Sequence, residues 1–572
     1  MPGFVVMVGQ EVQEPHPSVP YRSLRSLAVD RFSGDGYVVE RFANTKFLRD
    51  KVFAEDEDVL VALDGVVLNF EDLRRSSGCA DRFHCVKKMY EEQGDRFFGA
   101  FRGEFGGLLY DKRKKKWLLF TNQVGSKSLF FYHDADLFVC ASELKVVTQR
   151  LRKFGRPCSL DTAGAYFLLT YGYMLEDYTL LKEVKKLKAG HYLEVGEGGV
   201  RVGCYHRLEN EPCGSHPKEK ILDTLEELFR EAVRLEYEKD VEYGYRHLAA
   251  LSGGLDTRMA VVTAHELGYT DITNLTFAQS GALDERIAQR IAADLCNEFL
   301  FYALDNGMFL PRALEGAIMA NDGLVIWAGA AHELTALSKV DFGQYGMLHT
   351  GQIGDAVLGS FLSEPNQRKP LPLRRGAYSK RLMGRIADVV ERLAGAYNSE
   401  EIFLFYNRAF NGALNGNWMT YQFTESGSPF LDPDFLAYAL RIPPAMRYEE
   451  AIYEEWILAK HPRAARYIWA NTQAYLSDGK IVRFIRNYAW RALARLLPRL
   501  FPRSMNPFDE WYKTNDTLRR FFTDYYDRNA WLLESEPQLS RDCKQLYDEG
   551  RVLEKCQVMT LLEGIKLHWH GG

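Results

Sequence analysis

The sequence predicts an α+β protein with two parts: an amino-terminal antiparallel β-sandwich and a carboxy-terminal α/β domain with a parallel sheet and a helical extension. Short apolar runs separated by turn-forming residues dominate the first 150 positions. From about residue 216, strand-like and helix-like stretches alternate, which is typical of parallel strands joined by crossover helices. The 572 residues are enough for more than one domain with its own core.

The amino-terminal part, residues 1–150, should be rich in strands. Apolar runs such as VLVALDGVVL (59–68), KWLLFTN (116–122) and LFVCAS (137–142) are bounded by Gly, Asn, Asp or clusters of charge. Between them, CVKKMYEEQGDRFF (85–98) carries apolar residues at helical spacing. Two stacked antiparallel sheets with a few helices fit this pattern.

A joining region at 151–215 leads into the second expected domain, residues 216–572. This domain should begin with helices and strands in alternation. Helices are expected at 218–238, 257–267 and 283–295, and strands at 247–251, 272–278 and 299–304. Beyond about residue 310 the pattern is mostly helical.

Composition and charge exclude several classes of protein. The net charge of −5 argues against a chain built mainly to bind nucleic acid, because phosphate contacts need a basic face. The nine cysteines form no C-x-x-C pair, so neither a disulfide framework nor a cysteine zinc module is expected. No signal peptide is visible, and no run of about 18 apolar residues could span a bilayer. We therefore expect a cytoplasmic protein with reduced thiols.

The segment LSGGLDT (251–257) lies between an expected strand and an expected helix. Its glycines and serine allow backbone N–H groups to form a concave cluster of donors for phosphate oxygens, and the helix adds its amino-terminal dipole. Asp256 would repel phosphate unless a cation lies between them, so it indicates Mg²⁺ bound to a pyrophosphate group. The alternative is a tight strand-to-helix turn with an aspartate near the helix start.

A second glycine-rich turn, HTGQIGDAVLGSF (349–361), contains Asp355. It can place a second carboxylate on the same Mg²⁺. Two such turns in one α/β unit favour a nucleotide site over a purely structural turn.

These motifs resemble those of a known family. SGGLDT resembles the pyrophosphate loop of the ATP-pyrophosphatase superfamily, and the whole chain resembles the asparagine synthetase family, which includes β-lactam synthetases and lasso-peptide cyclases. The segments that carry the resemblance are 102–132, 140–147, 171–195, TGQIGD and SPFLDPDFLAYALRIPP (428–444). The resemblance implies an Ntn-hydrolase-like glutaminase fold for 1–150 and an ATP-pyrophosphatase domain for 216–572.

The chemistry that this resemblance implies has two steps. A carboxylate attacks the α-phosphate of ATP to give an acyl-adenylate and pyrophosphate, and an amine then displaces AMP to give an amide. By the resemblance, Asp256 and Asp355 hold Mg²⁺, which stabilises the leaving pyrophosphate electrostatically. The remaining implied contacts are Ser252, Gly253, Gly254 and Thr257 around the pyrophosphate, and Leu251, Thr350 and Gly351 beside the AMP part.

The amino-terminal half departs from glutamine-hydrolysing members of the family. They need a cysteine directly after the initiator methionine as nucleophile, and this chain has Pro2. Their N-G-E-I-Y-N segment reads Asp-Gly-Val-Val-Leu-Asn at 64–69, and their Arg-Asp pair reads Thr121-Asn122. We therefore expect no glutaminase activity. The amine would be free ammonia, an amine on a second substrate, or an amine on the same molecule.

The synthetase half also departs from asparagine synthetases, in which a glutamate stands at the place of Gln352. An amide cannot take up a proton, so the general base must lie elsewhere. Glu425 is one candidate, and a structural carboxylate is the alternative. The family's late catalytic lysine is assigned to Lys480 or Lys513, although one alignment places Gln473 there and a solvated loop lysine is the alternative.

The sequence thus predicts an ATP- and Mg²⁺-dependent ligase that joins a carboxylate to an amine, and glutamine hydrolysis within this chain does not supply that amine. Both substrates remain open among small molecules, sugar acids and peptides, and the oligomeric state is not predicted. Two alternatives stand: an intramolecular cyclase of the β-lactam or lasso-peptide type, and an inert scaffold. The scaffold is suggested by Gln352 and by Ala356, which replaces a family glutamate.

A basic segment spans residues 480–504, with arginines at 483, 486, 491, 495, 499 and 503. On a helix they would form a basic band beside apolar residues. Such a helix could lie on an anionic membrane surface or dock an acidic partner. The alternative is the solvated face of a packed helix.

Overall fold

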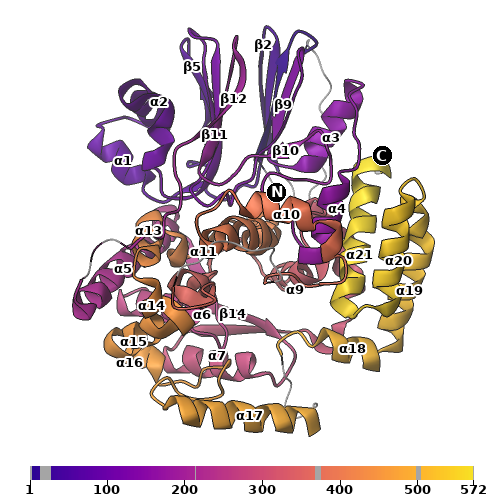
Figure 1. The fold of residues 1–572 in the computed structure, drawn as a ribbon. Helices are drawn as coiled ribbons and strands as arrows, with labels where there is room; N and C mark the ends of the chain where they lie inside the picture. Colours follow the sequence, from indigo (N-terminus) through magenta and orange to yellow (C-terminus); the bar gives the residue numbers. More distant parts are fainter. Residues whose placement is uncertain are drawn as a thin grey trace.

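The computed structural model describes residues 3–12, 27–212, 214, 216–366, 375–496 and 504–570. Three sheets organise the described chain: two six-stranded sheets from its amino-terminal part and one five-stranded sheet farther along. In Figure 1 the first two stand side by side at the top, and the third lies below them among helices. The expected α+β fold, antiparallel first and parallel second, is confirmed.

The two amino-terminal sheets are antiparallel throughout. The first has the order β10-β8-β9-β1-β3-β2, with β1 (Gly3–Gly9), β2 (Ala28–Gly34), β3 (Tyr37–Ala43), β8 (Phe130–His133), β9 (Leu137–Ala141) and β10 (Lys185–Lys186). The second has the order β12-β11-β7-β6-β5-β4, with β4 (Phe53–Glu55), β5 (Val59–Val67), β6 (Gly103–Asp111), β7 (Lys116–Thr121), β11 (His191–Gly196) and β12 (Gly199–Cys204).

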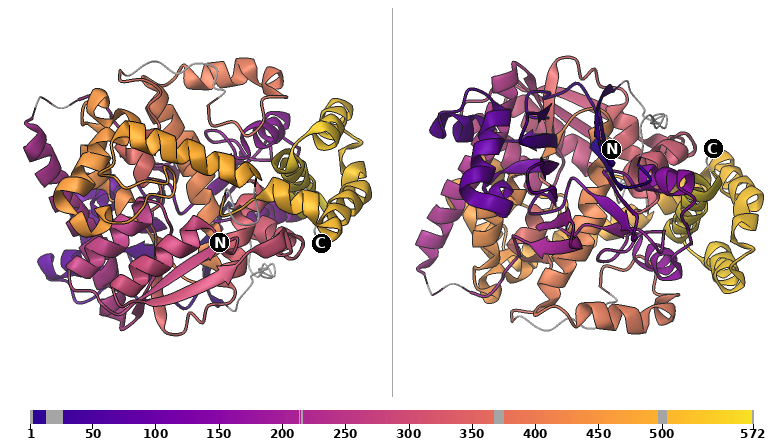
Figure 2. Two further views of the ribbon diagram at one scale, coloured as in Figure 1. Left: turned by 90° about the horizontal axis from the view of Figure 1, so that it is seen from below. Right: turned by 90° about the horizontal axis from the view of Figure 1, so that it is seen from above.

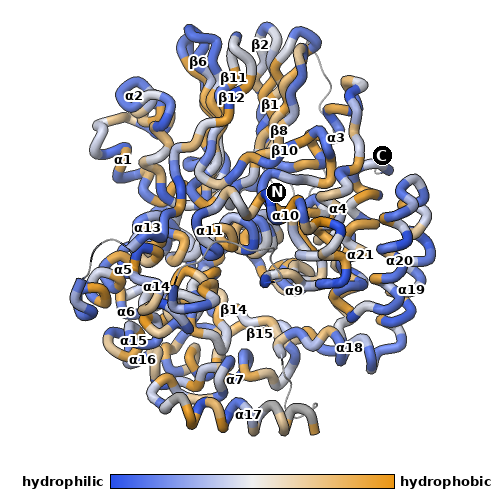
Figure 3. Tube along the Cα trace, in the orientation of Figure 1, coloured by the Kyte–Doolittle hydropathy of each residue, from blue (hydrophilic) through white to orange (hydrophobic). Residues whose placement is uncertain are grey.

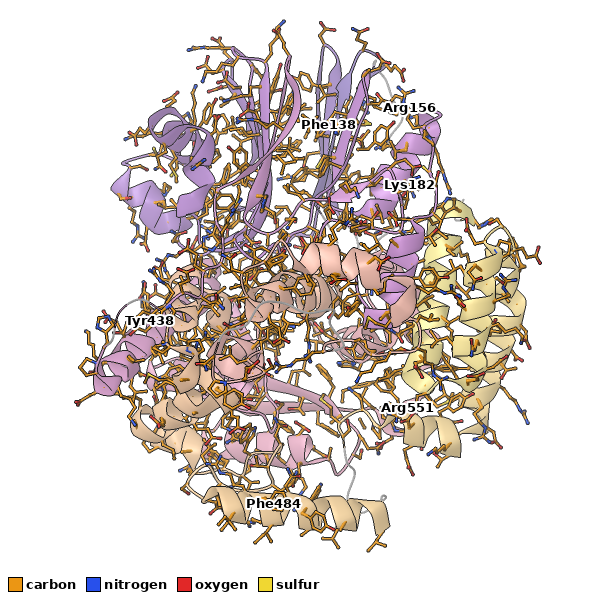
Figure 4. All side chains as sticks on the ribbon, viewed as in Figure 1. Phe138, Arg156, Lys182, Tyr438, Phe484 and Arg551 are labelled. Atoms are coloured by element: carbon orange, nitrogen blue, oxygen red, sulfur yellow. The ribbon has the colours of Figure 1, made fainter. Side chains whose placement is uncertain are left out.

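A shared apolar core joins these two sheets. Phe4, Val6 and Phe138 of the first sheet pack with Leu60 and Leu108 of the second, and all five side chains are buried. Figure 3 shows hydrophobic stretches along the strands of both sheets, and Figure 4 labels Phe138 between them. Two layers that bury one face each against the other form a β-sandwich.

The region expected to join the two halves contributes strands to the sandwich. β11 pairs with β7, and β10 pairs with β8, so residues 185–204 complete both antiparallel sheets. Helices of the amino-terminal half and of this region are α1 (Phe70–Ser76), α2 (Arg82–Gln93), α3 (Leu144–Lys153) and α4 (Thr162–Tyr171).

The third sheet is parallel and has the order β15-β14-β13-β16-β17. Its strands are β13 (Arg246–Ala250), β14 (Ile272–Ala278), β15 (Glu298–Ala303), β16 (Tyr345–His349) and β17 (Ser426–Gly427), and its first helices are α5 (Lys218–Tyr243), α6 (Asp256–Glu266) and α7 (Leu283–Asp294). The chain adds β14 and β15 on one side of β13 and then β16 on the other. In sheets of this kind, ligands bind where the strand order reverses, beyond the carboxyl ends of the strands.

Helices cover this sheet and extend beyond it. They are α8 (Leu310–Asn321), α9 (Trp327–Leu337), α10 (Ala387–Ala394), α11 (Glu400–Leu404), α12 (Leu414–Gly416), α13 (Pro433–Leu440), α14 (Pro444–Arg447), α15 (Ala451–Lys460), α16 (Pro462–Ala465), α17 (Lys480–Leu496), α18 (Phe508–Thr514), α19 (Asp516–Asn529), α20 (Pro537–Glu549) and α21 (Val552–Ile565). The last four form a separate layer at the right of Figure 1. Among the described residues, no helix combines the length and the hydropathy needed to cross a bilayer.

A buried ion cluster ties the sandwich to the parallel sheet. Glu425, the residue before β17, forms an ion pair with Lys51 Nζ at 2.6 Å and another with Lys127 Nζ at 2.7 Å. Lys127 also lies 3.4 Å from Asp64 in β5, and all four side chains are buried. Burial acts to raise the pKa of Glu425, but the charges of Lys127 and Lys51 outweigh it and hold that pKa below its usual value.

Replacing Glu425 should destabilise the fold. Glu425→Gln leaves the buried Lys51 without a carboxylate partner and Lys127 with Asp64 alone, and we expect the free energy of unfolding to fall by about 3–5 kcal/mol. Urea denaturation followed by circular dichroism measures this loss. The control is Asp548→Asn, which breaks an exposed pair with Lys544 on α20 and should cost at most about 0.5 kcal/mol. Equal stability of the two variants would contradict the structural role of the cluster.

Candidate functional site

A cavity of about 510 Å³ opens where the strand order of the parallel sheet reverses. It lies between the loop after β13 and the loop after β16. The sequence-predicted residues on its lining are Leu251, Ser252, Gly254, Asp256, Thr257, Thr350, Gly351 and Asp355. Gly253 belongs to the same loop but does not face the cavity. The two glycine-rich motifs, separate in the sequence, therefore form one site.

Side-chain hydrogen bonds hold the first turn in shape. Ser252 N donates to Thr257 Oγ1 at 3.0 Å, and Gly254 N donates to Ser252 Oγ at 3.2 Å. Gly253 N donates to Asp284 Oδ1 at 3.1 Å, which fastens the turn to α7. Helix α6 begins at Asp256, so its unpaired N–H groups and positive dipole end lie at the turn.

The second turn packs directly onto the start of α6. A Cβ on Gly351 would lie 2.3 Å from the backbone C of Asp256 and from the N of Thr257. A Cβ on Gly354 would lie 2.8 Å from Asp256 Cγ. Both glycines are therefore required by the close approach of the two turns.

This packing brings Asp256 and Asp355 together. Asp355 N donates to Asp256 Oδ2 at 3.1 Å, and Tyr453 OH donates to Asp256 Oδ1 at 2.9 Å. Ser360 Oγ donates to Asp355 Oδ2 at 2.8 Å. Burial, followed by the charge of Asp355, raises the pKa of Asp256 well above its usual range. Two carboxylates on adjoining turns, each feeling the other's charge, favour a shared cation.

The cavity is also lined by carboxylates that the sequence motifs did not indicate. Glu450 and Asp284 line it, and burial together with the charges of Asp355 and Glu454 raises the pKa of Glu450 to about 7. Glu450 has a φ of 60°, an uncommon left-handed backbone for a non-glycine residue. No short motif surrounds Glu450, so its place could be found only from the packing of α15 against the second turn.

The wall contributed by α9 carries His332 and Glu333. Thr420 Oγ1 donates to Glu333, and burial raises the pKa of this carboxyl to about 7. Burial lowers the pKa of His332 to about 4, so its ring is neutral at neutral pH. Nearby, the amides of Gln352 and Asn417 bond to each other. Glu333 is thus a lining carboxyl poised to exchange a proton near neutral pH.

A buried charge network supports the second turn from below. His349 Nε2 lies 2.8 Å from Asp240 Oδ2, and its Nδ1 lies 3.3 Å from Glu236 Oε2. Burial acts to lower the pKa of His349, but the carboxylates, Asp240 first, outweigh it and raise that pKa to about 9. His349 therefore stays charged at neutral pH and holds the end of β16 onto α5.

The remaining sequence candidates lie apart from the cavity. Glu425 sits in the buried ion cluster and does not line the cavity. Lys480 is the first residue of α17, and its side chain is outside the described part of the structure. Lys513 is exposed on α18, and Gln473 donates its side-chain amide to Ala470 O. Among the described residues that line the cavity, none is a lysine or an arginine.

In the amino-terminal half, Pro2 lies outside the described residues. A Cβ on Gly65 would lie 2.0 Å from Glu104 O and 3.0 Å from Lys127 Cε. The space beside the altered glutamine segment is therefore occupied by protein atoms, with the Lys127 side chain against Gly65 and near Asp64.

Comparison with known proteins shows which proteins this chain is similar to. The glutamine amidotransferase domain family matches residues 50–206. The chain is 26% identical over 262 residues to a putative glutamine-hydrolysing asparagine synthetase of Methanocaldococcus jannaschii, covering 43% of this chain and 49% of that protein. It is 23% identical over 461 residues to asparagine synthetase 2 of Lotus japonicus, covering 75% and 67% respectively. The chain is thus similar to asparagine synthetases over much of its length.

The chain spans about half the length of the archaeal relative that it matches. The matched amidotransferase region, 50–206, contains β4 to β12 and so includes the strands of the joining region. A solved allosteric regulatory enzyme of purine biosynthesis is 8% identical over 52% of this chain and 74% of that one, with a TM-score of 0.23. A TM-score this low supports no conclusion about this chain.

Substitution of Gly351 tests the contact between the two turns. Gly351→Ala places a methyl group against the backbone of Asp256 and Thr257, and the resulting shift should cost about 1–3 kcal/mol of stability. The control is Gly416→Ala, because Gly416 has helical backbone angles and open space around its Cβ position. Thermal unfolding compares the two. Gly351→Ala as stable as the control would show that the turns are not in contact.

Proposed function

We propose that this chain is an ATP- and Mg²⁺-dependent ligase that activates a carboxylate as an acyl-adenylate and passes it to an amine. The amine does not come from glutamine hydrolysis within this chain. The observation that carries the proposal is the pair Asp256 and Asp355, brought together by two interlocked turns at the mouth of a parallel sheet. Carboxylates at a phosphate-type turn bind a polyphosphate only with a cation between them.

The donor set suits Mg²⁺. Asp256 and Asp355 would hold the ion through hard carboxylate oxygens, and Gly354 lets the second turn approach the Asp256 carboxylate. When bound, Mg²⁺ neutralises charge on the pyrophosphate as it leaves. Because the described lining has carboxylates and no lysine or arginine, phosphate binding relies on this cation and on backbone N–H groups.

The rest of the cavity suits a nucleoside monophosphate. Ser252, Gly254 and Thr257 lie where the pyrophosphate would bind, beside the start of α6. Leu275 and Phe277 of β14 offer apolar surface for a base ring, and the backbone at Thr350 and Gly351 borders the same space. This arrangement presents the α-phosphate to a carboxylate that enters from the open side.

The second step needs a base, because an amine arrives as an ammonium ion and must lose a proton before it attacks. Glu333 takes this role, since it lines the cavity with a pKa of about 7. The amides of Gln352 and Asn417 cannot accept the proton. Glu425 stays in its pairs with Lys51 and Lys127, outside the cavity.

The amine source follows from the altered amino-terminal half. The segment that corresponds to the family's glutamine-binding residues is altered at 64–69 and at Thr121-Asn122, so this half would not hold glutamine for hydrolysis. The Lys127 side chain also packs against the altered glutamine segment at Gly65. The amine is therefore ammonia or an amine carried by a substrate, and the half that resembles a glutaminase serves as a structural support.

Pyrophosphate–ATP exchange tests the first step. Exchange should depend on Mg²⁺ and on one class of carboxylate in a panel of amino acids, sugar acids and peptides. Asp256→Asn and Asp355→Asn should each lower the exchange rate by about 100-fold or more, because each removes a ligand of the stabilising cation. The control is Asp516→Asn, an exposed carboxylate on α19. Near-normal exchange in either site variant would contradict the metal assignment.

Two further measurements, of glutamate release and of Mg²⁺–ATP binding, accompany this assay. Purified protein should release no glutamate from glutamine, and steady release would contradict the amine assignment. Failure to bind Mg²⁺–ATP at all would favour the inert scaffold over the ligase.

Substitution of Glu333 tests the second step. Glu333→Gln should leave exchange intact and lower amide formation by about 10²–10⁴-fold, since only proton removal from the amine is lost. In the wild type, amide formation should rise with pH through about 7, because the carboxylate form is the active one. The variant should lose the part of this rise that is due to Glu333 and follow only the fraction of amine that is uncharged.

Hydroxylamine provides the matched control, because it is largely uncharged at neutral pH and needs no base. Hydroxamate formation should therefore survive in Glu333→Gln. Equal loss with hydroxylamine and with the ordinary amine would mean that Glu333 acts in the first step instead.

A further inference from the structure

Helix α17 presents an apolar face that no other described part of the chain covers. Five large side chains recur at helical spacing along it and are mostly exposed: Ile481 (76%), Phe484 (72%), Ile485 (59%), Tyr488 (70%) and Leu496 (77%). In Figure 4 the helix runs along the lower edge of the molecule, where Phe484 is labelled. Scattered exposed apolar residues are ordinary, but a continuous stripe of them marks an interaction surface.

The helix is anchored from its other side. Arg483 Nη1 donates to Glu454 Oε1 at 2.5 Å, and its Nε donates to Asp478 O at 2.8 Å. Arg486 Nη1 donates to Asp478 Oδ2 at 3.0 Å. Seen from below, α17 lies across the near side of the molecule (Figure 2, left). The body of the protein therefore holds one side of α17 and leaves the apolar face directed outward.

The charge around this helix has one sign. Residues 480–504 contain one lysine, six arginines and no acidic residue, in a chain whose net charge is −5. Arg483 and Arg486 contact the body. The side chains of Lys480, Arg491 and Arg495, and residues 497–503, lie outside the described structure, so their contribution here is their charge alone.

We propose that α17 binds the surface of an anionic lipid membrane. The helix would lie in the plane of the interface, with Phe484, Ile485 and Tyr488 among the headgroups, and the net positive charge of residues 480–504 would favour anionic lipid. The charge selects an anionic partner. The apolar side chains project from a convex helix rather than line a groove, which suits a deformable lipid surface better than the preformed surface of a folded protein.

The position of α17 in the chain places the cavity beside that membrane. Trp469 and Asn471, shortly before the helix, line the cavity, and so does Met505, shortly after it. Because residues on both sides of α17 in the sequence line the cavity, membrane binding through α17 would bring the cavity toward that surface. This step rests on the proposed function, whereas the docking itself does not.

Vesicle flotation with the full chain tests the docking. Two vesicle types are used: pure phosphatidylcholine, and an equal mixture of phosphatidylcholine with phosphatidylglycerol. The chain should float with the anionic vesicles, bind the neutral ones much more weakly, and be released as salt rises. The triple variant Phe484→Ser, Ile485→Ser, Tyr488→Ser should bind at least about tenfold more weakly, because it loses its apolar insertion.

A matched control carries Val202→Ser, Val241→Ser and Trp531→Ser, which remove three apolar side chains of similar exposure elsewhere. It should bind like the wild type. Circular dichroism and thermal unfolding show whether each variant is folded, and pyrophosphate–ATP exchange in solution reports the cavity separately.

Several results would overturn the proposal. They are the absence of wild-type binding to anionic vesicles, equal binding to both vesicle types, and undiminished binding of the α17 variant. A wild-type dimer that becomes monomeric in the α17 variant, without vesicle binding, would identify the face as a contact between copies. Binding to poly-glutamate but not to vesicles would identify an acidic protein partner instead.

Discussion

The pairing of Glu425 with Lys51 and Lys127 is the interaction on which the rest of the arrangement depends. Glu425 O accepts a hydrogen bond from Leu348 N, so the residue that carries the buried charge also sets the register of β17 against β16. One step on, Thr350 donates to Gly427 O through both its N and its Oγ1. The sandwich, the edge of the parallel sheet and the second glycine-rich turn are thus fixed by one continuous set of contacts. A buried charge that is paired on both sides tolerates no other arrangement.

This dependence gives the amino-terminal half a structural role that does not depend on glutamine chemistry. Lys127 comes from the loop that precedes β8 and reaches the synthetase half through Glu425. Below the turn, His349 bridges Asp240 and Glu236 of α5. The carboxyl end of β16 is held by charge from two directions, and the cavity inherits its shape from both. Loss of the sandwich would therefore leave the buried Glu425 without its two lysine partners and loosen the turn that carries Asp355.

The sequence alone predicted the parts of the molecule that are encoded locally. Apolar periodicity indicated the antiparallel and parallel regions, and the two glycine-rich turns indicated the pair Asp256 and Asp355. The role of Glu425 was not local, because its lysine partners lie in the distant amino-terminal half. Glu333 and Glu450 were missed for a similar reason: each stands in a helical region without a motif and becomes a lining residue only through packing. The amphipathic character of 480–496 was readable, but not which face the body would cover.

The segment from Asn471 to Met505 begins and ends at the cavity wall. At its start, the buried Arg258 donates to the carbonyl oxygens of Tyr467 and Ile468, and Ala470 N donates to Gly253 O. At its end, Met505 O accepts from Gln279 N, next to β14. Both ends of this segment are therefore hydrogen-bonded to backbone next to the cavity wall. The segment that contains α17 is therefore attached next to the cavity at both of its ends. A change in the length of either end would displace residues of the cavity wall, whereas substitutions on the outer face of α17 would leave that wall in place.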